Sequence, residues 1–146
     1  MDKVQFVVER LISKGFKIAT AESCTGGLLA KTITDFPGCS AIFELGLVTY
    51  SDESKIRLLG VNPETLEKHS AVSREVALEM ARGLKKLTNC DIAISITGIA
   101  GPEGATQNKS IGLVYVCINN DIHELNLTGD RHQIRQQTVD FVLDML

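Results

Sequence analysis

Residues 17–27 read Lys-Ile-Ala-Thr-Ala-Glu-Ser-Cys-Thr-Gly-Gly, a short apolar run followed by a polar turn that contains two glycines. A helical pattern of apolar residues then begins at Leu28. Because the first N–H groups of a helix have no intrahelical partner, they form the positive end of the helix dipole. The stretch therefore predicts a strand that turns into a helix, with the Ser23 hydroxyl at that positive end.

Ser23 has two interpretations in this position. Most serines in front of a helix are plain N-caps, whose side-chain oxygen accepts a backbone N–H. Alternatively, Ser23 is a nucleophile, because free N–H groups stabilise an oxyanion and paired glycines let a ligand approach the backbone. Position alone leaves both interpretations open.

The composition is that of an ordinary globular protein. The chain has 146 residues, of which 44% are hydrophobic and 23% are charged, and one domain is the simplest organisation for this length. Its formal net charge is −3, whereas bulk binding of nucleic acid needs a basic surface. The composition argues against a nucleic-acid partner, but a few local arginines would suffice for a small anionic ligand.

The cysteines and histidines show no metal-binding pattern. None of the four cysteines forms a Cys-x-x-Cys pair, and the three histidines are scattered along the chain. We therefore expect reduced cysteines and no metal, as in a cytoplasmic protein. The N-terminus does not resemble a signal peptide, and no apolar run approaches the roughly 18 residues of a membrane span, so no membrane partner is expected.

Helical and strand patterns alternate around the opening turn. The periodicity predicts helices over residues 2–14, 28–36, 52–59, 73–87 and 130–145, a further helix beginning at Pro63, and strands over residues 17–22, 42–50, 92–96, 111–118 and 122–128. The last two strands form a hairpin. This alternation indicates an α/β fold, a three-layer α/β/α domain with a mixed β-sheet.

Three details of the pattern carry structural expectations. Gly46 lies inside a strand, where a glycine suggests a bulge or a close approach to the backbone. The helical period places Leu87 and Met145 on the buried faces of their helices. Asp130, with Gln133 three residues later, predicts a capping box for the last helix.

Glycine-containing turns follow three strands, at residues 25–27, 98–104 and 128–130. Ligands of open α/β sheets bind at strand ends. No turn matches the Walker A or Gly-x-Gly-x-x-Gly pattern, so a nucleoside triphosphate or dinucleotide site has weak support. Glycine after a strand is more often plain turn chemistry, but two such loops beside a serine at a helix start favour a binding site.

Lys55 and Tyr50 are the candidates that could activate Ser23. A solvated lysine is the default, yet a Ser–Lys pair is a known alternative to the Ser–His–Asp triad. Lys55 would then have to be neutral, so its pKa must fall from about 10.4 by roughly 2–3 units. Tyr50 is either a half-buried strand residue or a hydrogen-bond partner of the serine or lysine. Cys24 has no histidine base in view, so we interpret it as structural.

Arg131 and Arg135 lie one turn apart on the last helix, and Lys109 lies in the loop after Gly104. Arginines four residues apart are usually a solvated face. Arg131, however, follows a Gly-Asp turn at a helix N-terminus, where anions bind readily. The pattern is compatible with a phosphate site without requiring one.

The chain resembles the CinA C-terminal domain family over roughly residues 5–145. The motifs that carry the resemblance are Thr-Ala-Glu-Ser-Cys-Thr-Gly-Gly at 20–27, Val-Thr-Tyr-Ser at 48–51 with Lys55, Leu-Gly-Val at 59–61, Ala-Val-Ser at 71–73, Thr-Gly-Ile-Ala-Gly-Pro at 97–102, and Gly-Asp-Arg at 129–131 with Arg135. Together they are far more specific than any single glycine loop.

Characterised members of that family are nicotinamide mononucleotide amidohydrolases, so the resemblance implies hydrolysis of the nicotinamide carboxamide by a Ser/Lys mechanism without metal or cofactor. It implies Ser23 as nucleophile, Lys55 as general base and then acid, and Tyr50 as an assisting hydroxyl. The substrate-binding residues it implies are Cys24, Thr25, Gly26, Gly46, Thr97, Gly98, Ala100, Gly101, Lys109, Arg131 and Arg135. For so small an enzyme we also expect a homodimer.

Three loop positions depart from the usual family pattern, with Ser70 and Ala105 in place of glycines and Ser110 in place of a proline. The chain has no counterpart of the larger N-terminal domain of full-length CinA proteins, so we expect a stand-alone module. The alternative hypothesis is a non-catalytic module that binds a mononucleotide. A role in DNA uptake or repair has no support in the residues.

Overall fold

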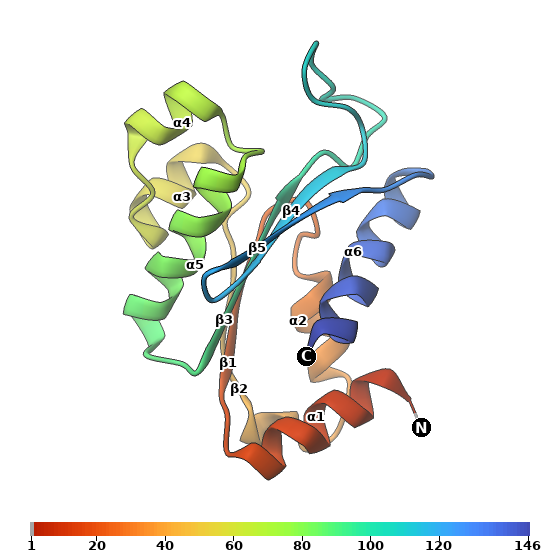
Figure 1. Ribbon diagram of the computed structural model, residues 1–146. Coiled ribbons are helices and arrows are strands. Elements are labelled where there is room, and N and C mark those ends of the chain that lie inside the picture. Colours follow the sequence, from red (N-terminus) through yellow and green to blue (C-terminus); the bar gives the residue numbers. More distant parts are fainter. Residues whose placement is uncertain (1) are drawn as a thin grey trace.

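The computed structural model describes residues 2–146 and shows a five-stranded sheet with helices on both faces (Figure 1). On one face lie α1 (Lys3–Lys14), α2 (Leu28–Thr34) and α6 (Arg131–Met145). The other face is covered by α5 (Arg74–Thr88), against which α3 (Asp52–Leu59) and α4 (Pro63–His69) pack. A short 3-10 helix, Cys39–Ala41, precedes the second strand. This is the three-layer α/β/α fold that the sequence predicts.

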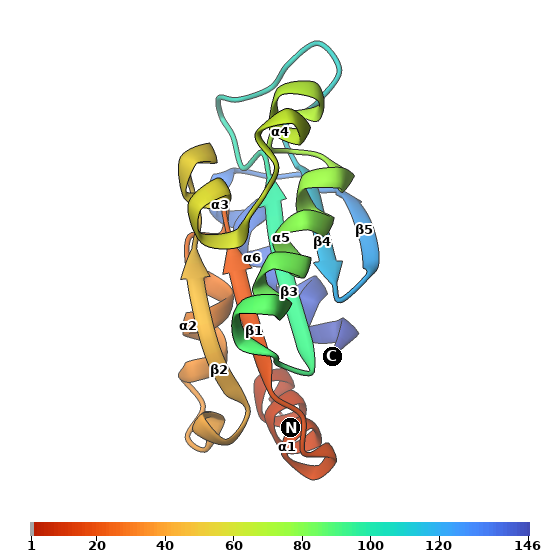
Figure 2. The ribbon, with the colours of Figure 1, turned by 90° about the vertical axis from the view of Figure 1, so that its left-hand side faces the viewer.

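The strands are β1 (Ile18–Glu22), β2 (Phe43–Val48), β3 (Ile92–Gly98), β4 (Leu113–Ile118) and β5 (Asp121–Asn126). Their order across the sheet is β2-β1-β3-β4-β5, as Figure 2 shows. β2, β1 and β3 are parallel, whereas β4 is antiparallel to both β3 and β5. The sheet is therefore mixed, and the carboxyl ends of β1, β2 and β3 meet at one edge, which we call the carboxyl edge.

β1 and β3 are the central strands of the sheet, and they are buried because helices cover both of their faces. All five residues of β1 are buried, as is the interior of β3. Val7, Leu29 and Val142 belong to the core beneath α1, α2 and α6. Met80 and Leu84 of α5 belong to the core on the other face. The loops at the carboxyl edge are thus held by a well-packed frame.

Polar residues begin the helices where the sequence predicts. Ser51, Asn62 and Ser73 each accept a hydrogen bond from a backbone N–H in the first turn of α3, α4 and α5. Asp130 forms the predicted capping box of α6. Because its cap fixes where α3 starts, it also fixes the direction in which Lys55, in the first turn of that helix, leaves the backbone.

The prediction that Leu87 and Met145 lie on the buried faces of their helices is wrong. Leu87 and Met145 are 56% and 47% exposed. Each lies in the last turn of its helix, where fewer neighbouring elements cover the apolar face. Among residues 2–146, no helix is both long and apolar enough to cross a membrane.

Candidate active site

Ser23 lies directly after β1, at the carboxyl edge of the sheet. Its backbone N–H donates to the carbonyl of Ile96 in β3 at 2.9 Å, which continues the pairing of the two strands by one residue. Ser23 is 8% exposed. The predicted turn is confirmed, and its serine is held in a fixed place that solvent still reaches.

Glu22, rather than Ser23, caps the helix that follows. The Glu22 carboxylate is buried and accepts the backbone N–H groups of Leu29 and Ala30 at 2.9 and 3.1 Å. Gly27 is at the N-cap position, and Ser23 makes no capping bond among the residues described. The interpretation of Ser23 as a plain N-cap is therefore wrong. Sequence reasoning missed Glu22 because its carboxylate acts from outside the usual cap position.

Lys55 is bonded to Ser23 inside the protein. Lys55 Nζ donates to Ser23 Oγ at 3.0 Å and to the carbonyl oxygens of Thr49 and Tyr50 at 2.8 and 3.0 Å. The residue is fully buried and forms no ion pair within residues 2–146. Burial lowers the pKa of Lys55, against a smaller opposing effect of the Asp52 charge. The default of a solvated lysine is wrong, since this amine is buried and aimed at a serine hydroxyl.

Tyr50 takes part in this site through its backbone. Its carbonyl oxygen accepts from Lys55 Nζ, and Ser23 Oγ donates to the same oxygen at 3.4 Å. The residue is 57% exposed, and its hydroxyl accepts a hydrogen bond from Arg131 Nη2 at 3.0 Å. The expected contact of the Tyr50 hydroxyl with Ser23 or Lys55 is therefore wrong, because the chain presents the carbonyl instead.

The turn after β1 offers backbone donors beside Ser23. The Gly26 N–H is already taken by the Ser23 carbonyl at 3.1 Å. The N–H groups of Cys24, Thr25 and Gly27 have no backbone acceptor within residues 2–146. Those of Cys24 and Thr25 follow Ser23 directly, which makes them the candidate donors to an oxyanion. Gly26 has a φ of +58°, and a Cβ there would lie 3.2 Å from Arg135 Nη2, which explains the glycine.

The Cys24 thiol is poorly suited to nucleophilic attack. Burial raises its pKa to about 11, with smaller opposing effects of the Arg135 and Arg131 charges. A thiol with that pKa is protonated at neutral pH, which supports a structural interpretation of Cys24. All four cysteines are free, and residues 2–146 contain no cluster of three His, Cys, Asp or Glu side chains suited to a metal ion.

The two arginines of α6 contact different loops of the carboxyl edge. Arg131 Nη1 donates to the Gly101 carbonyl at 2.8 Å, and Arg135 Nη2 donates to the Thr25 carbonyl at 3.0 Å. Neither forms an ion pair with a carboxylate of residues 2–146. Arg131 is exposed, whereas Arg135 is half-buried. Two unpaired guanidinium groups beside the turn that carries Ser23 make this edge suitable for an anionic ligand.

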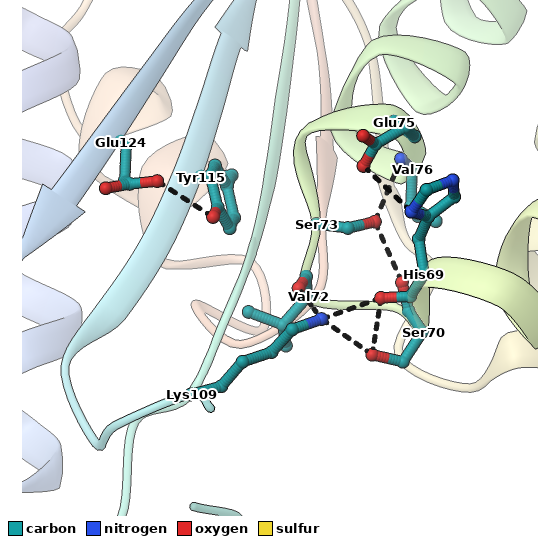
Figure 3. Close-up of polar contacts among 9 residues, drawn as sticks. All are labelled: His69, Ser70, Val72, Ser73, Glu75, Val76, Lys109, Tyr115 and Glu124. Atoms are coloured by element: carbon teal, nitrogen blue, oxygen red, sulfur yellow. Dashed lines mark hydrogen bonds and ion pairs between the residues drawn. The ribbon is translucent and has the colours of Figure 1, made fainter. Parts of the chain in front are cut away.

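Lys109 makes its side-chain hydrogen bonds to the turn between α4 and α5. Its ammonium donates to the carbonyls of His69 and Val72 at 2.6 and 2.5 Å and to the Ser70 hydroxyl at 2.8 Å (Figure 3). These three bonds use all three ammonium protons. In this structure the Lys109 ammonium is therefore occupied by the protein itself, and its expected contact with a substrate stays a prediction.

Three other predicted ligand residues, Thr97, Gly98 and Ala100, have structural roles within the protein. Thr97 is buried, and its hydroxyl donates to the Ala71 carbonyl at 2.9 Å. A Cβ on Gly98 would lie 2.7 Å from Val114 Cγ2. Ala100 belongs to the core. The expected contacts of these three residues with a substrate stay predictions.

Gly46 is also explained by packing. It pairs with Thr20, and a Cβ there would lie 2.9 Å from the Phe43 ring and 3.1 Å from Thr20 Oγ1. The irregularity of β2 lies earlier, where pairing passes from Phe43 to Leu45 and leaves Glu44 as the extra residue. A bulge at Gly46 is therefore wrong, and its close neighbours are side chains of the protein itself.

A family model described as the CinA C-terminal domain matches residues 2–146. Among similar proteins, a competence-damage inducible protein of Clostridium botulinum is 52% identical over 146 residues, which is 97% of this chain and 36% of that protein. One from Alkaliphilus oremlandii is 50% identical over 97% of this chain and 35% of its own length. The chain thus spans about a third of the length of the curated relatives it matches.

Solved structures show the same fold. The competence damage-inducible protein A of Klebsiella pneumoniae superimposes with a TM-score of 0.95 at 36% identity, covering 98% of this chain and 91% of that chain. A competence/damage inducible protein of Agrobacterium tumefaciens superimposes with a TM-score of 0.90 at 38% identity, covering 99% and 94%.

Proposed function

Because this chain belongs to the CinA C-terminal domain family, we propose that it hydrolyses the carboxamide of nicotinamide mononucleotide to nicotinate mononucleotide and ammonia. The observation that carries the proposal is the 3.0 Å hydrogen bond between Lys55 Nζ and Ser23 Oγ. A buried amine without a carboxylate partner, aimed at a serine hydroxyl, is the arrangement of a Ser/Lys hydrolase. The proposed reaction uses no metal and no cofactor.

The first step is attack by Ser23. Neutral Lys55 takes the proton from Ser23 Oγ while that oxygen forms a bond to the carboxamide carbon and the carbonyl electron pair moves onto oxygen. The lowered pKa of Lys55 makes the neutral amine accessible at a lower pH than in a free lysine. The carbonyls of Thr49 and Tyr50 hold Nζ in place and accept hydrogen bonds from the ammonium that forms.

The oxyanion is placed against the turn after β1. The N–H groups of Cys24 and Thr25 would donate to it, each typically worth about 3 kcal/mol in such sites. The Lys55 ammonium then gives its proton to the departing nitrogen as the C–N bond breaks, and ammonia leaves. Water, deprotonated by Lys55, hydrolyses the ester on Ser23 and restores both residues.

Arg131 is the residue that we assign to the phosphate of the mononucleotide. It is exposed, unpaired by any acid of residues 2–146, and held beside the site by Tyr50 and Gly101. Arg135 is half-buried and bonded to the Thr25 carbonyl, which suits a role in holding the turn that carries Ser23.

An ammonia-release assay on nicotinamide mononucleotide tests the proposal, with nicotinamide and its riboside as comparison substrates. Ser23→Ala is expected to lower kcat by at least about 10³-fold, because it removes the nucleophile. Ser40→Ala, at an exposed serine outside the site, is the matched control and should keep wild-type activity.

Two outcomes would contradict the proposal. If a folded Ser23→Ala protein still releases ammonia, Ser23 is not the nucleophile. A wild-type protein that binds the mononucleotide by calorimetry and releases no ammonia is the non-catalytic binding module instead.

A further inference from the structure

The loop between β3 and β4 leaves the carboxyl edge in two unequal parts. Ile99, Ala100 and Gly101 are buried. Residues 102–108 are all exposed, and Figures 1 and 2 show this part of the chain projecting beyond the sheet. We call residues 102–109 the arm. The Gly101 carbonyl accepts a hydrogen bond from Arg131 Nη1 at 2.8 Å. Because Gly101 directly precedes the arm, the arm begins beside the residue that we assign to the substrate phosphate.

Lys109 supplies every hydrogen bond that joins the arm to the rest of residues 2–146. Its ammonium reaches the turn between α4 and α5, where it meets two carbonyls and the Ser70 hydroxyl (Figure 3). The other hydrogen bonds of the arm are internal and link Thr106 to Lys109. Among residues 2–146, a single side chain therefore makes all the hydrogen bonds that tie the arm to the rest of the fold.

The acceptor turn has a backbone shape that is unusual for a serine. Ser70 has φ +60° and ψ 171°, a conformation that favours glycine. Its hydroxyl donates to the His69 carbonyl at 2.6 Å and accepts from Lys109. Ser73 Oγ donates to the Ser70 carbonyl at 2.8 Å and so fixes the turn from the other side. The Ser70 hydroxyl accepts a hydrogen bond from Lys109, which gives a reason for a serine at a position whose backbone favours glycine.

We propose that Lys109 is a positioning residue for the amidase reaction, acting through a strap that ties the arm to residues 69–72. The strap fixes the loop at one end, and the bond from Arg131 to Gly101 fixes it at the other. Releasing the strap frees the arm, so that Gly101 no longer orients Arg131 for the substrate. The effect on the substrate rests on the proposed function, whereas the strap itself does not.

Limited proteolysis tests the strap without any reference to activity. Lys109→Met keeps an unbranched apolar stem and removes all three donors. Lys68→Met is the matched control, because Lys68 lines the same surface pocket and makes no hydrogen bond within residues 2–146. A glutamate-specific protease should cleave after Glu103 at least about tenfold faster in Lys109→Met, since the arm opens more often. Wild-type cleavage rates in both variants overturn the strap.

Kinetics of ammonia release test the positioning role. Lys109→Met is expected to raise KM for nicotinamide mononucleotide by about five- to tenfold while kcat stays within about twofold, because binding geometry changes and the Ser/Lys pair does not. Lys68→Met should leave both constants unchanged. A loosened arm with an unchanged KM overturns the positioning role. If the wild-type protein releases no ammonia, the proposed function fails, and cleavage rates and calorimetric affinity for the mononucleotide still decide this inference.

Ser70→Ala is the second variant, for the case in which Lys109→Met does not fold. It removes one of the three acceptors without changing Lys109, so cleavage after Glu103 should accelerate by about two- to fivefold. A folded Ser70→Ala protein cleaved at the wild-type rate contradicts the strap.

Discussion

Two lysines of this chain are bound by the same kind of acceptors, two backbone carbonyls and one serine hydroxyl. The acceptors are Thr49, Tyr50 and Ser23 for Lys55, and His69, Val72 and Ser70 for Lys109. Lys55 is fully buried, whereas Lys109 is half-exposed. Burial disfavours the charged amine, so the same three contacts suit the proton acceptor that we propose at Lys55 and the strap that we propose at Lys109.

The serines of the two clusters differ as well. Ser23 lies beside the N–H groups of Cys24 and Thr25, which have no backbone acceptor within residues 2–146. The Ser70 hydroxyl donates to the carbonyl of its own neighbour, His69, at 2.6 Å, compared with 3.4 Å for the bond that Ser23 donates. A Ser–Lys hydrogen bond is therefore not enough to identify a catalytic pair. The proposed pair, Ser23 and Lys55, differs from the other in the burial of its lysine and in the N–H groups without a backbone acceptor beside its serine.

Replacing each lysine by methionine tests this distinction most strongly. Lys55→Met is expected to lower kcat for nicotinamide mononucleotide by at least about 10³-fold, because the general base and acid are lost together. Lys109→Met should keep kcat within about twofold of wild type. Steady-state ammonia release measures both. Equal losses of kcat in the two variants would remove the distinction between the clusters.

The pH dependence should also separate the two lysines. Because burial lowers the pKa of Lys55, kcat/KM should rise by up to about tenfold per pH unit below that pKa and level off above it. Between that pKa and the ordinary value of 10.5, the unfolded chain binds more protons than the folded one. The free energy of unfolding therefore gains a contribution that increases with pH through this window.

Two variants serve as controls for this pH dependence. The difference in unfolding free energy between wild type and Lys55→Met, from urea titrations at several pH values, should increase as pH rises. Lys109→Met should keep the wild-type pH–rate profile. A difference that decreases with rising pH would mean that the folded protein stabilises the Lys55 ammonium.

Most of the fold could be predicted because its signals are local. Ser51, Asn62, Ser73 and Asp130 cap helices through atoms within three residues of themselves, and each start was predicted. The continuous apolar run of β3 reports burial on both faces without knowledge of its neighbours. Local patterns fail at Leu87, because the exposure of a last helical turn depends on which other element covers it.

For the candidate site, the sequence brought forward two residues that the structure places in contact, Ser23 and Lys55, but it did not give most of their other contacts. The turn nominated Ser23, and the resemblance selected Lys55. The bond between them spans 32 positions in the chain, and the one from Lys109 to His69 spans 40. Long side chains of this kind have many rotamers, so their partners follow only from the packed structure. For the same reason the sequence could not tell the Tyr50 carbonyl from its hydroxyl.

The smallest expected effect is on the free energy of unfolding, when Ser70 and Ser23 are each replaced by alanine and by glycine. Ser70→Ala keeps the positive φ and loses the hydroxyl bonds, which lowers the free energy of unfolding by about 1–2 kcal/mol. Ser70→Gly loses the same bonds but relieves strain of about 1–3 kcal/mol, against about 0.5–1 kcal/mol of added chain entropy.

Urea unfolding should therefore find Ser70→Gly more stable than Ser70→Ala by about 1 kcal/mol. Ser23 is not among the residues with positive φ, so there the order should reverse, with Ser23→Gly less stable than Ser23→Ala. If Ser70→Ala proved the more stable of its pair, the turn at Ser70 would hold no strain. In that case the hydrogen bond between Lys109 and the Ser70 hydroxyl would have no backbone strain to offset.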